Sequence, residues 1–228
     1  IDRGLVGSEM CIRDRGKTKR FQCSILWPAV SKLTLRRSST QKFAVAIAPA
    51  GGGYHPTHSR LLELLEQVTD AGSVLCVYVV QPDPLPARGR LEVSNPEAFD
   101  ELLRYFPRLH FHFGGMLHAY EHLLRLMHRS PLLTTNLAGA LGKPRLLDVV
   151  LERAAEEDLG HRLYFASGFP NLDPTSALEH LLGHNVWRRE RGAPSLPSSL
   201  LRGIAERGNP VDYEPGTETG RTESGPKA

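Results

Sequence analysis

Short apolar runs alternate along the chain with amphipathic stretches, and this alternation restricts the fold more than any other feature. Five runs have the character of strands buried on both faces of a sheet: Phe43–Ala48, Val74–Val80, Leu109–Phe113, Leu132–Leu137 and Arg162–Ala166. The stretches that repeat apolar residues on one helical face are Arg60–Val68, Pro96–Tyr105, Leu117–Met127, Pro144–Glu157, Ser176–Leu182 and Pro197–Arg207. A repeated strand–helix order is typical of parallel strands joined by crossover helices, so the sequence predicts an α/β fold. A barrel and a doubly wound sheet both satisfy this pattern.

The composition divides the chain into three zones. Residues 42–210 hold the strand–helix pattern and form the predicted domain. Residues 211–228 are rich in Gly, Pro, Glu, Thr and Ser, a composition typical of a disordered tail. Residues 1–41 form a basic leader without sustained periodicity, which predicts a second disordered terminus. Whether the leader is native coding sequence stays open, because the run from Ser8 to Arg15 resembles translated sequencing-adapter read-through.

Composition and motif content argue against several functional classes. No apolar run approaches the roughly 18 residues that span a membrane, and the first residues lack the pattern of a secretory signal. Cys11, Cys23 and Cys76 fit neither a zinc ribbon nor a Cys-x-x-Cys motif, which favours a reducing, cytoplasmic compartment. Aromatic residues do not interleave the basic leader as they do in single-strand binders, so nucleic acid is not an expected partner. The chain has neither a Gly-x-Ser-x-Gly elbow nor a phosphate-binding glycine loop.

Two groups of histidines are linked to the predicted strand Leu109–Phe113: one lies on it and one follows it. Alternation places His110 and His112 on the same side of their strand, close to the strand end where α/β barrels carry their active sites. They are either metal ligands or histidines that pack at the rim. His118, Glu121 and His122 form the His-x-x-Glu-His pattern of some zinc proteases. Their helix is expected to cover the outside of the strand, so a solvated face is the alternative.

A third group, His55 and His58, follows the glycine-rich turn after the first predicted strand. These side chains either line a substrate pocket or open the next helix, and the second interpretation is favoured.

Three motifs follow one another in the patterned region. A Phe106-Pro107 pair precedes a strand that carries His112. The run from Leu163 to Pro170 is followed by an Asp-Pro pair, and the predicted last helix ends in Gly-Asn. In this order the motifs resemble the amidohydrolase-related family, a branch of the amidohydrolase superfamily that includes decarboxylases of aromatic and unsaturated acids. The resemblance covers the C-terminal half of that family's eight-stranded barrel. It implies one or two divalent metals, usually zinc, and hydrolase or decarboxylase chemistry.

The resemblance also implies where metal ligands are expected. His112 matches the histidine of the sixth strand and is the predicted metal ligand. Tyr78 stands where the fifth-strand histidine is expected, and Gly168 stands where the eighth-strand aspartate is expected. Ala46 takes the place of a strand-four lysine, and no counterpart of the strand-one histidine pair precedes His55. No residue is therefore predicted to be catalytic, and the substrate-binding residues are unknown.

These observations predict a partial TIM-barrel-like fold with about five parallel strands and disordered termini. The predicted function is an amidohydrolase-like, metal-dependent hydrolase or decarboxylase scaffold that is catalytically impaired, with zinc as the expected metal and a small molecule as substrate where activity is kept. The alternatives are a non-catalytic binding or interaction module and a truncated fragment of an amidohydrolase-family enzyme. Because five strands cannot close an eight-stranded barrel, a partner chain or a second copy is expected to cover the open edges.

Overall fold

One sheet organises the part of the chain that the computed structural model describes, namely residues 9–14, 17–26, 43–70, 74–80, 91–115, 117–167 and 172–207. Its strands are β1 (Glu9–Asp14), β2 (Lys17–Leu26), β3 (Phe43–Ile47), β4 (Val74–Val80), β5 (Phe111–Gly114), β6 (Leu133–Asn136) and β7 (Leu163–Tyr164). The strands from β2 to β7 pair in parallel, and β1 pairs antiparallel to β2. The five predicted parallel strands are thereby confirmed as β3 to β7.

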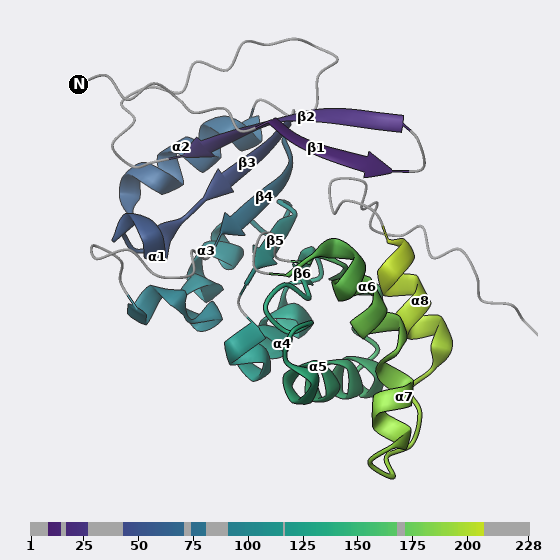
Figure 1. Ribbon diagram of the computed structural model, residues 1–228. Helices are drawn as coiled ribbons and strands as arrows, with labels where there is room; N and C mark the ends of the chain where they lie inside the picture. Colours follow the sequence, from purple (N-terminus) through teal and green to yellow (C-terminus); the bar gives the residue numbers. More distant parts are fainter. Residues whose placement is uncertain are drawn as a thin grey trace, which may run out of the picture.

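The order of the strands decides between the two α/β architectures. Each strand lies beside its neighbour in sequence, in the order β1-β2-β3-β4-β5-β6-β7. A doubly wound sheet reverses its strand order at a switch point, whereas a barrel adds strands in one direction. The uninterrupted order is therefore that of a partial barrel, and Figure 1 shows the strands following one another across the molecule.

Helices follow each parallel strand from β3 onward. They are α1 (Pro49–Gly52), α2 (Ser59–Asp70), α3 (Asp100–Tyr105), α4 (Tyr120–Arg129), α5 (Pro144–Glu156), α6 (Pro174–Leu182), α7 (His184–Arg189) and α8 (Ser198–Glu206), with short 3-10 segments η1 (Leu91–Ser94), η2 (Pro96–Phe99), η3 (Leu117–Ala119) and η4 (Gly160–Arg162). The last three helices gather at the β7 end of the sheet (Figure 1). Among the described residues, no helix combines the length and the apolar character that crossing a bilayer requires.

Local sequence signals explain several of these boundaries. Asn95 caps η2, since its side-chain oxygen accepts a hydrogen bond from the Glu97 amide at 3.0 Å, and Pro96 follows in the first turn. Asp173 caps α6 in the same way, through the amide of Ser176. These caps fix where each helix begins, so the chain leaves the preceding segment in a defined direction.

The structure differs from the predictions in two places. No strand was predicted in residues 1–41, yet β1 and β2 lie there and β2 pairs in parallel with β3. Backbone pairing with a neighbouring strand is not visible in local hydrophobic periodicity. Two short helices, α1 and α7, also form where no helix was predicted. The predicted tail, residues 211–228, lies outside the described residues.

The core lies between the sheet and its helices. Val45, Val77, Phe111 and Leu133 come from four successive strands, and all are buried. They pack in one hydrophobic cluster with leucines of the helices, including Leu64 of α2. Burial of each such side chain contributes about 1.5–3 kcal/mol. Because strand residues alternate between faces, the opposite face carries a different set of side chains, and these form the candidate site.

Candidate functional site

Four residues on adjacent strands lie in one row across the sheet, on the face opposite the helices. The register pairs Ala46 with Tyr78, Tyr78 with His112, and His112 with Thr134. The first three occupy positions that the family resemblance relates to its metal-binding strands, so the structure brings these predicted positions side by side. Gly168, where the family's aspartate was expected, lies outside the described residues.

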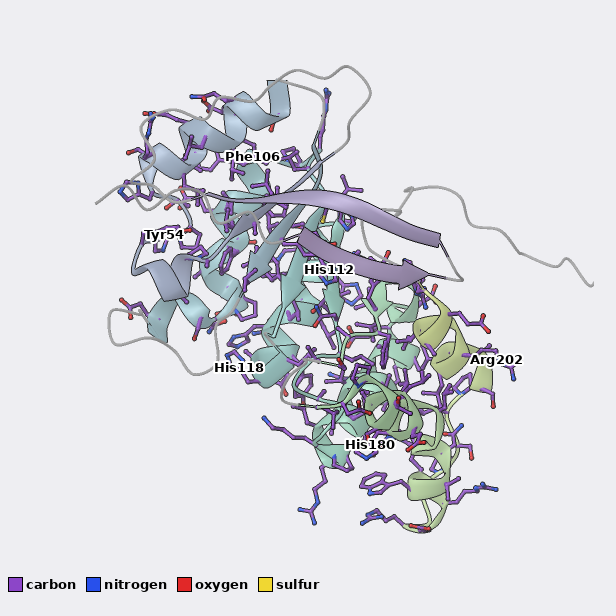
Figure 2. The ribbon with its side chains drawn as sticks, turned by 45° about the horizontal axis from the view of Figure 1, so that its top comes forward. Tyr54, Phe106, His112, His118, His180 and Arg202 are labelled. Atoms are coloured by element: carbon purple, nitrogen blue, oxygen red, sulfur yellow. The ribbon has the colours of Figure 1, made fainter. Side chains whose placement is uncertain are left out.

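His112 is enclosed by polar and aromatic neighbours. Its side chain is 2% exposed. The rings of Tyr78 and Tyr164 meet it edge-to-face, with centroids 5.3 Å and 5.6 Å away. Figure 2 shows His112 among the strands in the interior of the molecule. A ring so enclosed makes its polar contacts with protein groups rather than with solvent.

Both ring nitrogens of His112 have hydrogen-bond partners on β6. Nδ1 lies 2.9 Å from the hydroxyl oxygen of Thr134, and Nε2 lies 3.0 Å from the side-chain nitrogen of Asn136. The oxygen of the Asn136 amide accepts a hydrogen bond from the backbone N–H of Ala138 at 3.1 Å, which fixes the orientation of the amide. Asn136 therefore donates to Nε2, and a neutral His112 carries its proton on Nδ1 and donates it to Thr134.

His110 joins the same network through Thr134. Its Nε2 lies 2.8 Å from the Thr134 hydroxyl, whereas the other acceptor for that hydroxyl, the Phe111 carbonyl oxygen, lies at 3.4 Å. The shorter contact favours donation from Thr134 to His110. A one-way chain of hydrogen bonds then runs from Asn136 through His112 and Thr134 to His110. The prediction that the two histidines lie on one side of the strand is confirmed by their shared hydroxyl.

Burial keeps both imidazoles uncharged. It lowers the pKa of His110 to about 4. Burial, together with a smaller repulsion from His110, lowers the pKa of His112 to about 3. A general base works best with a pKa near the operating pH, so neither histidine is tuned for that role at neutral pH. The network is suited to holding β5 and β6 together through neutral hydrogen bonds.

The zinc that the resemblance implies does not fit these residues. A catalytic zinc takes three protein ligands and keeps one open position. In the row, only His112 is a common zinc ligand, and the lone pair of its Nε2 already accepts from Asn136. In the ranges that the structure describes, no three His, Cys, Asp or Glu side chains are grouped closely enough to hold a metal ion.

The His-x-x-Glu-His group does not assemble either. His118 lies exposed in η3, before α4 begins, and Figure 2 shows it apart from His112. Nδ1 of His122 lies 3.0 Å from the side-chain oxygen of Asn95, the residue that caps η2. Its Nε2 lies 3.7 Å from Glu97. These contacts belong to the outer helical layer, in agreement with the expected solvated face.

His55 and His58 make local turn contacts. Nδ1 of His58 accepts a hydrogen bond from the Arg60 amide at 3.2 Å, at the start of α2. Nδ1 of His55 contacts the Thr57 hydroxyl at 2.8 Å, and both histidines are exposed. The interpretation that this segment opens the next helix is therefore confirmed for His58.

Thr134, Asn136 and Tyr164 complete the site, and sequence reasoning did not single them out. A signal was present at the end of β6, where the run Leu-Thr-Thr-Asn places polar residues on a predicted strand. Polar groups on a buried strand need partners, and here the partners are the histidines of the neighbouring strand.

Comparisons with known proteins support the fold and leave the chemistry unassigned. No family model matches the chain, and no curated protein matches it. The crystal structure of an uncharacterized TIM-barrel protein from Bordetella bronchiseptica is similar, with a TM-score of 0.50 and 21% sequence identity. The match covers 71% of this chain and 53% of that protein, so the chain spans about half the length of the structure that it matches. At this identity the likeness extends to the barrel fold alone.

Proposed function

We propose that this chain is an amidohydrolase-like barrel scaffold that does not perform the metal-dependent hydrolysis or decarboxylation of that family. One observation carries the proposal: both ring nitrogens of His112, the matched ligand position, are engaged by Thr134 and Asn136. A metal needs a free lone pair on the imidazole. Here the only unprotonated nitrogen of His112 is the acceptor for the Asn136 amide.

A second argument is the free energy needed to release His112 from its hydrogen bonds so that it could bind a metal. If His112 turned to bind a metal, the Asn136 amide would lose its acceptor inside the protein. An unsatisfied buried polar group costs about 1–3 kcal/mol. The neighbouring positions in the row supply no good additional metal ligand, because Ala46 has no ligand atom and a neutral tyrosine such as Tyr78 binds zinc poorly.

Zinc stoichiometry tests the proposal. Chelator-treated protein would be incubated with zinc, desalted and assayed by elemental analysis, beside His112→Ala and the matched surface variant His118→Ala. We expect well below one zinc per chain in all three proteins. One zinc per chain in the wild type and in His118→Ala, lost in His112→Ala, would overturn the proposal and revive the metal-dependent enzyme.

A binding role on the same scaffold is the second candidate. It is favoured by a pocket that lies away from the row of strand residues, between α5 and the junction of α6 and α7. A scaffold without its metal chemistry can still carry a ligand site on another surface, since sites are grafted onto folds.

A further inference from the structure

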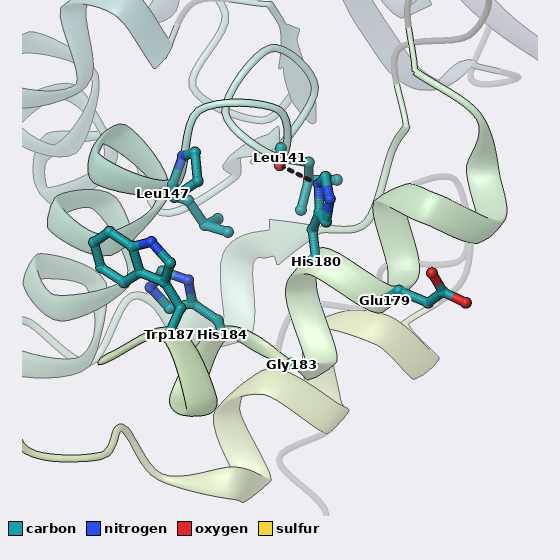
Figure 3. A pocket seen from close by; sticks show the side chains of 8 residues that line it. Leu141, Leu147, Glu179, His180, Gly183, His184 and Trp187 are labelled. Atoms are coloured by element: carbon teal, nitrogen blue, oxygen red, sulfur yellow. Dashed lines mark hydrogen bonds between the residues drawn. The ribbon is translucent and has the colours of Figure 1, made fainter. Parts of the chain in front are cut away.

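The pocket between α5 and the α6–α7 junction has a volume of about 160 Å³. Leu141, Pro144 and Leu147 supply apolar lining, and His180, His184 and Trp187 supply rings. Figure 3 shows Leu147 near Trp187 and His184, and Leu141 beside His180. A cavity of roughly 150 Å³ accommodates a benzene ring. The pocket is thus large enough for one small ring or a branched aliphatic group.

A wider cavity of about 380 Å³ adjoins this pocket and shares Pro144 and Trp187 with it. Its remaining lining residues are Lys143, Arg145 and Arg191, so three cations line the cavity next to the apolar pocket. Lys143, Arg145 and Arg191 are all exposed. The two cavities together form a groove with an apolar inner end and a cationic outer end.

These three cations lack acidic partners. Within the ranges that the structure describes, none of them forms an ion pair with a carboxylate, and Arg191 lies over the Trp187 ring at 4.1 Å. Two acids of α5, Asp148 and Glu152, both pair with Arg188. Glu179 is at the pocket, but its carboxylate points away from the enclosed space in Figure 3. The three cations thus have no ion-pair partner within the described part of the chain.

The wall formed by α7 is held firmly in place. Arg188 is 2% exposed and pairs with Asp148 and Glu152 of α5, and its Nε donates to the Pro194 carbonyl at 2.6 Å. Nε2 of His184 lies 3.0 Å from Asp148, and its ring stacks on Trp187 with centroids 5.2 Å apart. A ligand would find this wall already formed, which reduces the ordering cost of binding.

The junction between α6 and α7 adds to this rigidity. A Cβ atom on Gly183 would lie 2.8 Å from the carbonyl oxygen of Glu179, so only glycine permits this close approach. His180 is oriented as well, because its Nδ1 lies 2.9 Å from the Leu141 carbonyl oxygen and donates to it (Figure 3). The pocket lining is thus set by contacts of the fold itself.

We propose that this groove binds a small organic phosphate, with its apolar group in the pocket and its phosphate among Lys143, Arg145 and Arg191. Three cations without ion-pair partners suit a dianion, and a phosphate monoester carries a charge of about −1.5 to −2 at neutral pH. Guanidinium groups match the phosphate oxygens in charge and in geometry. The adjoining apolar pocket distinguishes such a ligand from a bare anion.

Three probes separate the contributions of charge and apolar surface: phenyl phosphate, inorganic phosphate and benzyl alcohol. Binding to the full-length chain is followed by tryptophan fluorescence in a Trp27→Phe background, where Trp187 is the remaining tryptophan. We expect phenyl phosphate to bind at least about tenfold more tightly than either of the other probes. Lys143→Gln with Arg145→Gln should weaken it by about tenfold or more. Arg202→Gln, an exposed cation on α8, serves as the matched control and should leave the affinity unchanged.

The outcomes are distinct. Equal affinity for phenyl phosphate and inorganic phosphate would mean attraction to surface charge alone and would overturn the proposal. So would the absence of saturable binding, or an equal loss of affinity in Arg202→Gln. Because Lys143 and Arg145 are exposed, their substitution should leave the melting temperature unchanged, and a loss of affinity in folded variants then reports on the groove. None of these results depends on zinc binding by His112, so the two proposals can fail separately.

Discussion

His112 accepts a hydrogen bond at Nε2 from the side-chain amide of Asn136, across 3.0 Å between neighbouring strands. Because the amide oxygen is held by the Ala138 backbone, the direction of this bond is fixed. The bond sets the tautomer of His112, and through Thr134 it determines which nitrogen of His110 accepts. His112 is thereby the centre of a neutral hydrogen-bonded chain.

The first prediction concerns the protonation of His112. We expect a neutral ring with its proton on Nδ1 from pH 7 down to pH 5, because burial lowers its pKa to about 3. Long-range ¹H–¹⁵N correlation spectra of uniformly ¹⁵N-labelled protein distinguish the two tautomers and the charged form. Spectra of His112→Gln assign the resonance, and the urea-unfolded protein should titrate near pH 6.5. A proton on Nε2, or a charged ring at pH 6, would contradict the hydrogen-bond chain.

The second prediction is that the free energy of unfolding falls as the pH is lowered below about 6.5. Both histidines have pKa values below the ordinary 6.5 in the folded protein, about 4 and about 3, so the unfolded chain binds more protons in this window. Their stabilising contribution is complete above pH 6.5. Below that pH it declines by about 1.4 kcal/mol per pH unit for each histidine.

Urea unfolding at pH 7, 6 and 5 measures this slope. The variant His112→Asn removes one of the two histidines, so its stability should depend less steeply on pH than that of the wild type. Parallel curves for the two proteins would show that His112 is not held neutral by the fold.

The third prediction concerns Asn136→Ala. This substitution leaves Nε2 of His112 without its donor and the Ala138 N–H without its side-chain acceptor. We expect a loss of about 1–3 kcal/mol in the free energy of unfolding, measured by urea denaturation at pH 7. Gln67→Ala, on the exposed side of α2, is the control and should change stability by less than about 0.5 kcal/mol. Equal effects of the two substitutions would mean that the Asn136 bond contributes nothing to stability.

Much of the fold follows from sequence patterns because its strands and helices are locally encoded. The strand Val74–Val80 was predicted with the bounds that the structure has, since a β-branched apolar run identifies a buried strand without reference to its neighbours. By contrast, α7 was not predicted from the sequence. It has few apolar residues, and its inward face depends on Arg188, which is buried only because α5 supplies Asp148 and Glu152.

The candidate site was predictable only in part, for a similar reason. Alternation along one strand places His110 and His112 on the same side, which requires no knowledge of the register. The partners Thr134 and Asn136 come from the adjacent strand, and their positions depend on the pairing of Phe111 with Leu133. That register is a property of the assembled sheet. The sequence could therefore identify the histidines but not the hydrogen-bond partners of their ring nitrogens.

The fourth prediction concerns the buried cation that joins α7 to α5. Arg188→Ala leaves Asp148 and Glu152 without their guanidinium partner and the Pro194 carbonyl without its donor. We expect a loss of about 3 kcal/mol in the free energy of unfolding, at the lower end of the range for breaking a buried ion pair, because both acids keep some exposure. Arg104→Ala removes a surface pair with Asp100, whose arginine side chain is 74% exposed, and should cost less than about 1 kcal/mol.

A second measurement on the same variant separates the electrostatic role of Arg188 from its packing. Burial is the main cause that lowers the pKa of His184, and the positive charge of Arg188 lowers it further, while Asp148 opposes both effects. Removing the arginine charge should therefore raise the pKa of His184 in an NMR titration. Arg188→Met keeps much of the side-chain volume without the charge, so it should raise the pKa in the same way with a smaller loss of packing. If the pKa of His184 stayed constant in both variants, the arginine would not act on His184 through its charge.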